Sequence, residues 1–136
     1  MKLNLQYSPT PENARKLADI FVSAALRIDG VKLDFSVASL AAADRIIENF
    51  RSEGLAVEQI AETLFSVGCY VGEVFVAQAG GVWRPTETTS MAGFASAPMV
   101  MELEKTVCNP IDKAFKRFQN GQEDNLPYFY QVFTSR

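Results

Sequence analysis

The sequence predicts a single α+β domain over residues 1–136, with about five helices packed against a small, mainly antiparallel sheet. The first observation behind this prediction is the stretch from Val57 to Ala79. After its first turn and a half, this stretch carries apolar residues on every side. A helix that is apolar nearly all round is a buried helix, and strands rarely exceed about eight residues. We therefore expect a central core helix at 57–79.

The second observation is the order of the remaining elements. Short alternating stretches and amphipathic helical stretches do not follow one another regularly, as they would in a doubly wound sheet. No internal repeat, low-complexity tract or interdomain linker divides the chain. Helices packed on a small antiparallel sheet fit this order best.

The region before the core helix is predicted to contain two short strands, each followed by an amphipathic helix. Residues 1–8 and 31–35 alternate between apolar and polar side chains, which is the period of a strand. A single apolar stripe runs along residues 10–28, and Gly30 is a natural stop for this helix. Ser36 is expected to cap the second helix.

The region after the core helix is predicted to hold the remaining strands and two short helices. Turn residues and hydrophobic periodicity mark the elements, while the loop between the strands shows no clean period. In chain order we expect a strand starting at Val82, a loop at 86–97, a hairpin of residues 99–103 and 106–108, a helix opening at Asn109-Pro110 and a last helix capped by Asp124.

The composition argues against several classes of protein. The formal net charge is -3, whereas binding to nucleic acid needs clustered Lys and Arg, so no nucleic-acid partner is expected. Glu58, Gln59, Glu62 and Glu73 interrupt the core helix, so no membrane span is expected. The first residues lack the apolar run of a signal peptide. We expect a soluble, cytoplasmic protein.

The absence of His bears most directly on chemistry. It removes the commonest general base, the commonest transition-metal ligand and every Ser-His or Cys-His nucleophile. Cys69 and Cys108 are too few for a zinc site and are expected to be buried, reduced thiols, with a redox pair as the alternative. No phosphate loop or catalytic signature is present. We predict no catalytic residue, no metal and no cofactor.

The middle of the core helix holds the residues that most need an explanation. Gly68 and Gly72 share one face of the helix, although glycine there costs about 1 kcal/mol relative to alanine. Either another backbone approaches closely, or the glycines leave room for a ligand beside Tyr70 and Glu73. A carboxylate in this apolar run should be paired or lie at a polar edge. Glu73 is either a ligand-contacting acid or base, or the partner of one of four cations, Arg84, Lys113, Lys116 and Arg117.

Two further features complete the candidate site. Trp83, the only Trp, either packs in the core or anchors a ligand or partner. Lys113, Lys116 and Arg117 are spaced for one helix face, which is either solvated or binds an anion or acidic partner. The predicted ligand- or partner-binding surface comprises Tyr70, Glu73, Trp83, Arg84, Lys116 and Arg117.

Several motifs resemble a pattern found in a group of small bacterial proteins of unknown function. They are LDFS at 33–36, VGCYVGEV at 67–74, GGVW at 80–83 and NPIDKAFKRFQNG at 109–121. In that group the pattern reads LDYS, LGAYLGEV, GGxW and NPxxKVxKRxxNG, followed by a closing FY. The resemblance covers residues 33–133 and implies a recurring fold in a bacterial, cytoplasmic setting, but no activity. Val67 stands where the group has Leu, and the loop at 85–97 has no counterpart.

We expect a non-catalytic domain that acts through a protein partner or a small ligand. One alternative is an enzyme that acts on a small anionic substrate, with Glu73 as base and Arg84 or Arg117 holding the substrate. Another is an immunity-type protein that neutralises a toxin, which suits the acidic net charge. The chain is expected to be a monomer, or a homodimer formed through its aromatic segment at 127–133.

Overall fold

The computed structural model describes residues 3–135 and confirms an α+β fold, in which five α-helices accompany a small antiparallel sheet. The helices are α1 (Ala14–Asp29), α2 (Leu40–Ser52), α3 (Val57–Ala79), α4 (Pro110–Asn120) and α5 (Leu126–Thr134). The sheet has the order β1-β2-β3, made of β1 (Val82–Pro85), β2 (Met99–Glu102) and β3 (Val107–Cys108). Short 3-10 turns lie at Pro11–Asn13, Thr86–Thr88 and Gln122–Asp124.

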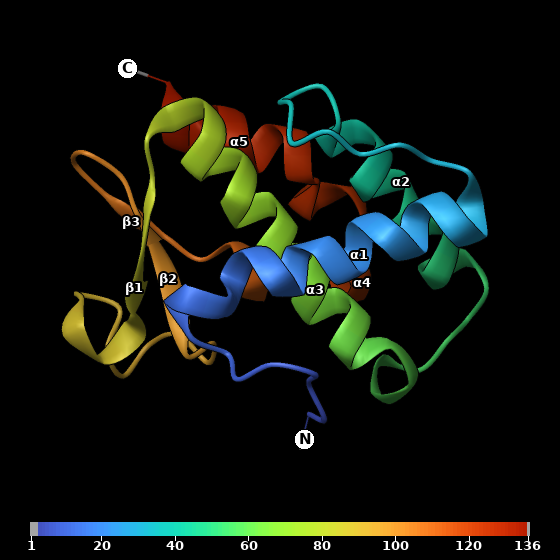
Figure 1. Cartoon of the computed structure of the whole chain (residues 1–136), viewed down its shortest axis with the longest axis horizontal. Helices are drawn as coiled ribbons and strands as arrows, with labels where there is room; N and C mark the ends of the chain where they lie inside the picture. The colour runs from blue at the N-terminus through green and yellow to red at the C-terminus, as the bar shows by residue number, and fades with distance from the viewer. Residues whose placement is uncertain (1–2, 136) are drawn as a thin grey trace.

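Helix α3 is the predicted core helix, with the predicted bounds. Leu64, Cys69 and Tyr70 lie on different sides of it, and all three are 0% exposed. Figure 1 shows α3 in the middle of the fold, with α1 crossing it and the sheet beside its C-terminal end. Phe75 contacts Phe129 and Tyr130 of α5, with ring centroids 5.8 and 4.7 Å away. Neighbours on most sides of its middle part explain why the apolar residues of this helix are not confined to one stripe.

The two glycines of α3 explain how closely its neighbours approach. A Cβ atom on Gly68 would overlap the backbone of Ile111 at the start of α4. A Cβ atom on Gly72 would overlap the indole ring of Trp83 in β1. Of the two explanations that the sequence left open, close approach of another part of the chain is the one that the structure supports.

Two predicted strands do not form. Residues 3–8 and 31–35 are irregular, and residues 1–2 of the first predicted strand lie outside the described residues. The alternation was misleading because these segments bond to side chains of α3 instead of to a neighbouring strand. The Asn4 N–H donates to Glu62 over 2.9 Å, and the Phe35 N–H donates to the Tyr70 hydroxyl over 2.8 Å.

The other predicted elements form close to their expected positions. Gly30 ends α1 with a left-handed φ of 67°, a conformation that glycine adopts readily. The predicted hairpin forms, with Met101 opposite Cys108. Asn109 caps α4 by accepting the Asp112 N–H over 3.0 Å.

Two predicted helix caps differ from the structure. Ser36 lies a turn before α2, where its hydroxyl accepts the Ser39 N–H over 3.1 Å, and Ser39 is the residue that precedes the helix. Asn125, not Asp124, caps α5 through its side-chain oxygen. Asp124 instead pairs with Lys113, at 2.6 Å.

The most deeply buried ionic contact lies at the end of α4. The guanidinium of Arg117 is 0% exposed and donates two hydrogen bonds to the carboxylate of Asp44 in α2, at 2.9 and 3.2 Å. Its Nη1 lies 2.9 Å from Glu48 as an ion pair, although it is not aligned for a hydrogen bond. Asp44 also accepts the N–H of Leu126 over 2.9 Å. One cation therefore joins α2, α4 and the start of α5.

Replacing Arg117 with Met should lower the free energy of unfolding by about 3–5 kcal/mol, because Asp44 would become a buried carboxylate without a counter-ion. Arg84→Met is the matched control, since it breaks a pair with Glu102 in which the side chains are 48% and 44% exposed. An exposed pair of this kind contributes about 0–1 kcal/mol. Urea denaturation measures both losses, and equal losses would contradict the structural role of Arg117.

The Lys113–Asp124 pair predicts how stability changes with pH. Lys113 holds the pKa of Asp124 below its usual value. A carboxylate whose pKa is lower in the folded state adds stability above its unfolded pKa of about 3.9, and this stability is lost as the pH falls through the folded pKa. Asp124→Asn should therefore lower stability at neutral pH and make acid unfolding less steep. Glu123→Gln, at an exposed neighbouring position, should leave the profile unchanged. If the stability of Asp124→Asn falls as steeply with decreasing pH as that of the wild-type protein, the role assigned to the Lys113–Asp124 pair is refuted.

Candidate functional site

The six residues predicted to form one binding surface do not form one, because Tyr70, Trp83 and Arg117 are buried. Tyr70 is 0% exposed. Its hydroxyl accepts the Phe35 N–H over 2.8 Å and lies 2.6 Å from the Ser39 hydroxyl. Its ring packs on Phe35 and Phe21, with centroids 4.7 and 5.7 Å away. Phe35 has a φ of 63°, which is strained for a bulky residue, so Tyr70 serves to hold the chain before α2.

Glu73 has a partner that the sequence did not suggest. Its Oε2 accepts a hydrogen bond from the indole Nε1 of Trp83 over 2.8 Å. Trp83 is 7% exposed and packs over Gly72, so it belongs to the core. The expected ion pair between Glu73 and a cation is wrong. An indole N–H satisfies a carboxylate at the edge of the core as a cation would.

The four cations considered for Glu73 are distributed over the molecule. Arg84 lies on the exposed face of the sheet, where it pairs with Glu102, and Lys116 is exposed on α4. Lys113 pairs with Asp124, whereas Arg117 is fully buried. The predicted cationic face of α4 is therefore wrong, because its members differ in exposure.

The cysteines are free and buried, as predicted. Burial raises the pKa of both thiols, that of Cys108 to about 12. A thiol with so high a pKa stays protonated at neutral pH and is a poor nucleophile. Among residues 3–135, no group of three or more His, Cys, Asp or Glu side chains is arranged to hold a metal ion.

Helix α3 has the length and hydropathy that would allow it to cross a membrane, but 72% of its most apolar window is buried inside the fold. Burial of this extent is what the core helix of a soluble protein shows. The structure is consistent with the soluble protein that the sequence predicts.

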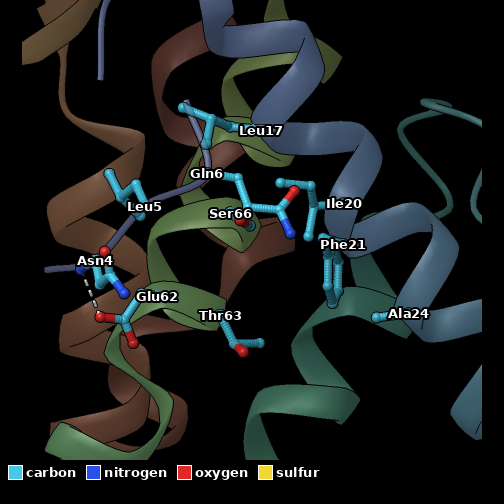
Figure 2. A pocket seen from close by; sticks show the side chains of 10 residues that line it. All are labelled: Asn4, Leu5, Gln6, Leu17, Ile20, Phe21, Ala24, Glu62, Thr63 and Ser66. Atoms are coloured by element: carbon cyan, nitrogen blue, oxygen red, sulfur yellow. Dashed lines mark hydrogen bonds between the residues drawn. The ribbon is translucent and has the colours of Figure 1, made fainter. Parts of the chain in front are cut away.

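A pocket that the sequence did not reveal opens between α1, α3 and the N-terminal segment (Figure 2). Its volume is about 370 Å³. Helix α1 supplies an apolar wall made of Leu17, Ile20, Phe21 and Ala24. Helix α3 supplies a polar wall made of Glu62, Thr63 and Ser66. The N-terminal segment crosses one side of the pocket with Asn4, Leu5 and Gln6.

Ser66 is the most unusual residue of this pocket. It is 4% exposed, yet its hydroxyl makes no hydrogen bond with any residue that the structure describes. A helical serine commonly bonds to the carbonyl one turn earlier, but this one does not. Water or a ligand in the pocket can supply a partner for this hydroxyl.

Glu62 is also only partly satisfied. Its Oε2 accepts the Asn4 N–H over 2.9 Å, and its second carboxylate oxygen has no partner within residues 3–135. Figure 2 shows the Asn4 bond on the side of the pocket formed by the N-terminal segment. A carboxylate can accept up to about four hydrogen bonds, so Glu62 retains capacity for a ligand.

Gly72→Ala tests whether the α3 glycines serve packing. Alanine gains about 1 kcal/mol of helix propensity, but its Cβ would overlap the indole of Trp83, and overpacking costs about 1–3 kcal/mol. We expect net destabilisation in the wild-type background and none in Trp83→Phe, where the smaller ring leaves room. Denaturant unfolding of the two single variants and the double variant gives the coupling free energy between positions 72 and 83. A stabilising Gly72→Ala in the wild-type background would show that the space beside Gly72 is open.

Comparisons of the chain with protein-family models, with curated proteins and with solved structures find no match. The resemblance to small bacterial proteins of unknown function, carried by residues 33–133, therefore stays a prediction.

Proposed function

We propose that this protein is a non-catalytic domain that binds a small ligand in the pocket between α1, α3 and the N-terminal segment. The observation that carries the proposal is the hydroxyl of Ser66, which lines the pocket and makes no hydrogen bond with the described residues. The volume of about 370 Å³ lies within the range of about 300–1,000 Å³ typical of ligand sites. An apolar wall with a few convergent polar groups is also typical of such sites.

The same geometry favours binding over catalysis. General acid–base chemistry needs a proton-transfer group within hydrogen-bond reach of the substrate. The alternative in which Glu73 acts as base gains no support, because its Oε2 is held 2.8 Å from the indole nitrogen of Trp83. Arg117, one of the two substrate-holding candidates, is 0% exposed and paired with Asp44.

The remaining expectations stay predictions attached to this proposal. The bacterial, cytoplasmic setting rests on the resemblance described above. The immunity-type alternative rests on the net charge of -3 alone. A homodimer through the segment at 127–133 would use Tyr128 and Val132, which are 59% and 48% exposed on α5. No contact in the described part of the chain favours either the toxin partner or the second copy over a small ligand.

A fragment screen observed by two-dimensional NMR tests the proposal. Small aromatic fragments that carry one hydrogen-bonding group should shift the backbone resonances of Thr63, Ser66 and Ala24. Ala24→Phe should abolish these shifts, because the larger ring fills the space against the apolar wall. Ala41→Phe is the matched control, since Ala41 is exposed on α2, away from the pocket, and should leave binding unchanged.

Circular dichroism shows whether each variant keeps its fold. The proposal fails if no fragment shifts the pocket resonances, or if folded Ala24→Phe binds the fragments as the wild-type protein does. A cluster of shifts on α5 instead would favour a function at the segment 127–133.

A further inference from the structure

We propose that the ligand of this pocket is a small organic cation, in which a primary ammonium group is joined to an apolar body. This inference rests on the proposed function, and it adds the chemical class of the ligand. It follows from the charge of the polar wall, the spacing of its acceptors and the character of the wall that faces it.

The charge of the lining comes from a single residue. Glu62 is the one ionisable side chain among the residues that line the pocket, and no Lys or Arg lines it. One oxygen of this carboxylate is engaged by the Asn4 N–H, while the other is unpartnered within residues 3–135. A cation that enters such a partly enclosed site meets an attraction greater than it would meet in water, whereas an anion meets repulsion.

The spacing of the acceptors suits an ammonium group. Glu62 and Ser66 are one turn apart on the same face of α3, and Cβ atoms at this spacing lie about 5–6 Å apart. A primary ammonium has three N–H donors and no acceptor. It can therefore donate to the free oxygen of Glu62 and to the Ser66 hydroxyl together, and the Thr63 hydroxyl lines the same pocket. Hydrogen bonds to charged groups contribute more than those between neutral groups.

The opposite wall explains the apolar body. Leu17, Ile20 and Phe21 face the polar wall across the pocket (Figure 2). Ile20 and Ala24 are half-buried and offer apolar surface to the pocket, while Leu17 and Phe21, 0% and 2% exposed, fix this wall in the core. A ring or an alkyl chain that packs against this wall is removed from water, which favours binding.

Cations do lie nearby, but outside this pocket. Lys16 and Arg27 line a neighbouring shallow depression on α1, together with Asp19. The depression shares Gln6, Ile20 and Ala24 with the pocket, so a ligand with a negative group can extend in that direction. This arrangement defines the competing result, in which an anionic ligand binds better than a cationic one.

Three matched probes separate these outcomes, namely 2-phenylethylamine, 2-phenylethanol and 3-phenylpropionate. They share a phenyl ring on a short chain and end in a cation, a neutral hydroxyl and an anion at neutral pH. Titration followed by two-dimensional NMR should give the strongest binding for the amine, then the alcohol, then the acid. Binding of the amine should also weaken as salt is added, because screening acts on the charged pair.

Variants of α3 identify the group responsible. Glu62→Gln should weaken binding of 2-phenylethylamine by about tenfold, the effect of losing a charge-assisted hydrogen bond, while binding of 2-phenylethanol changes little. The Gln oxygen can still accept the Asn4 N–H, so the N-terminal segment should keep its place. Glu58→Gln removes an exposed charge from the same helix outside the pocket and should change neither affinity.

The possible failures are distinguishable. If the three probes bind at the pocket with equal affinity, or if the acid binds best, the assignment of a cation is wrong and the small-ligand function stands. An unchanged amine affinity in Glu62→Gln also overturns the assignment. If none of the probes shifts the resonances of the lining residues, both this inference and the proposed function fail.

Discussion

The close packing of α3 is the constraint on which the rest of the structure depends. Most of this helix between Ile60 and Phe75 is buried, so other elements must cover most of its sides. Gly68 lets the start of α4 approach, and Gly72 makes room for the indole of Trp83. Once Trp83 lies there, its N–H reaches Glu73, which satisfies a carboxylate at the edge of the core. The packing positions of α3 therefore account for the two glycines and the carboxylate of the motif VGCYVGEV.

Much of the fold could be predicted, because the signals that specify it are local. The apolar character of residues 57–79 identified the core helix, and Gly30 and Asn109 marked the end of one helix and the start of another. The segments 3–8 and 31–35 were predicted wrongly as strands. Alternation of apolar and polar residues indicates an extended chain, but it does not show what the backbone bonds to. Here the partners are side chains on α3.

Long-range pairing is what the sequence could not supply. Arg117 has the spacing of a solvated cation, but Asp44, far away in the chain, accepts its hydrogen bonds inside the core. The pocket was missed for a related reason. Leu17 and Phe21 form an ordinary apolar stripe, and the space beside them depends on where the N-terminal segment crosses. Ser66, a hydroxyl within an apolar run, was the available signal. Only the structure shows that no described residue bonds to this hydroxyl.

The central claim is that α3 uses one set of positions for packing and another, at Glu62 and Ser66, for a ligand. A crystal structure of the protein with 2-phenylethylamine tests this claim most directly. The account predicts density for the amine between α1 and α3, with its nitrogen about 3 Å from Glu62 and Ser66, and an intact hydrogen bond from Trp83 to Glu73. An amine bound beside Glu73, with the Trp83 side chain displaced, would contradict it.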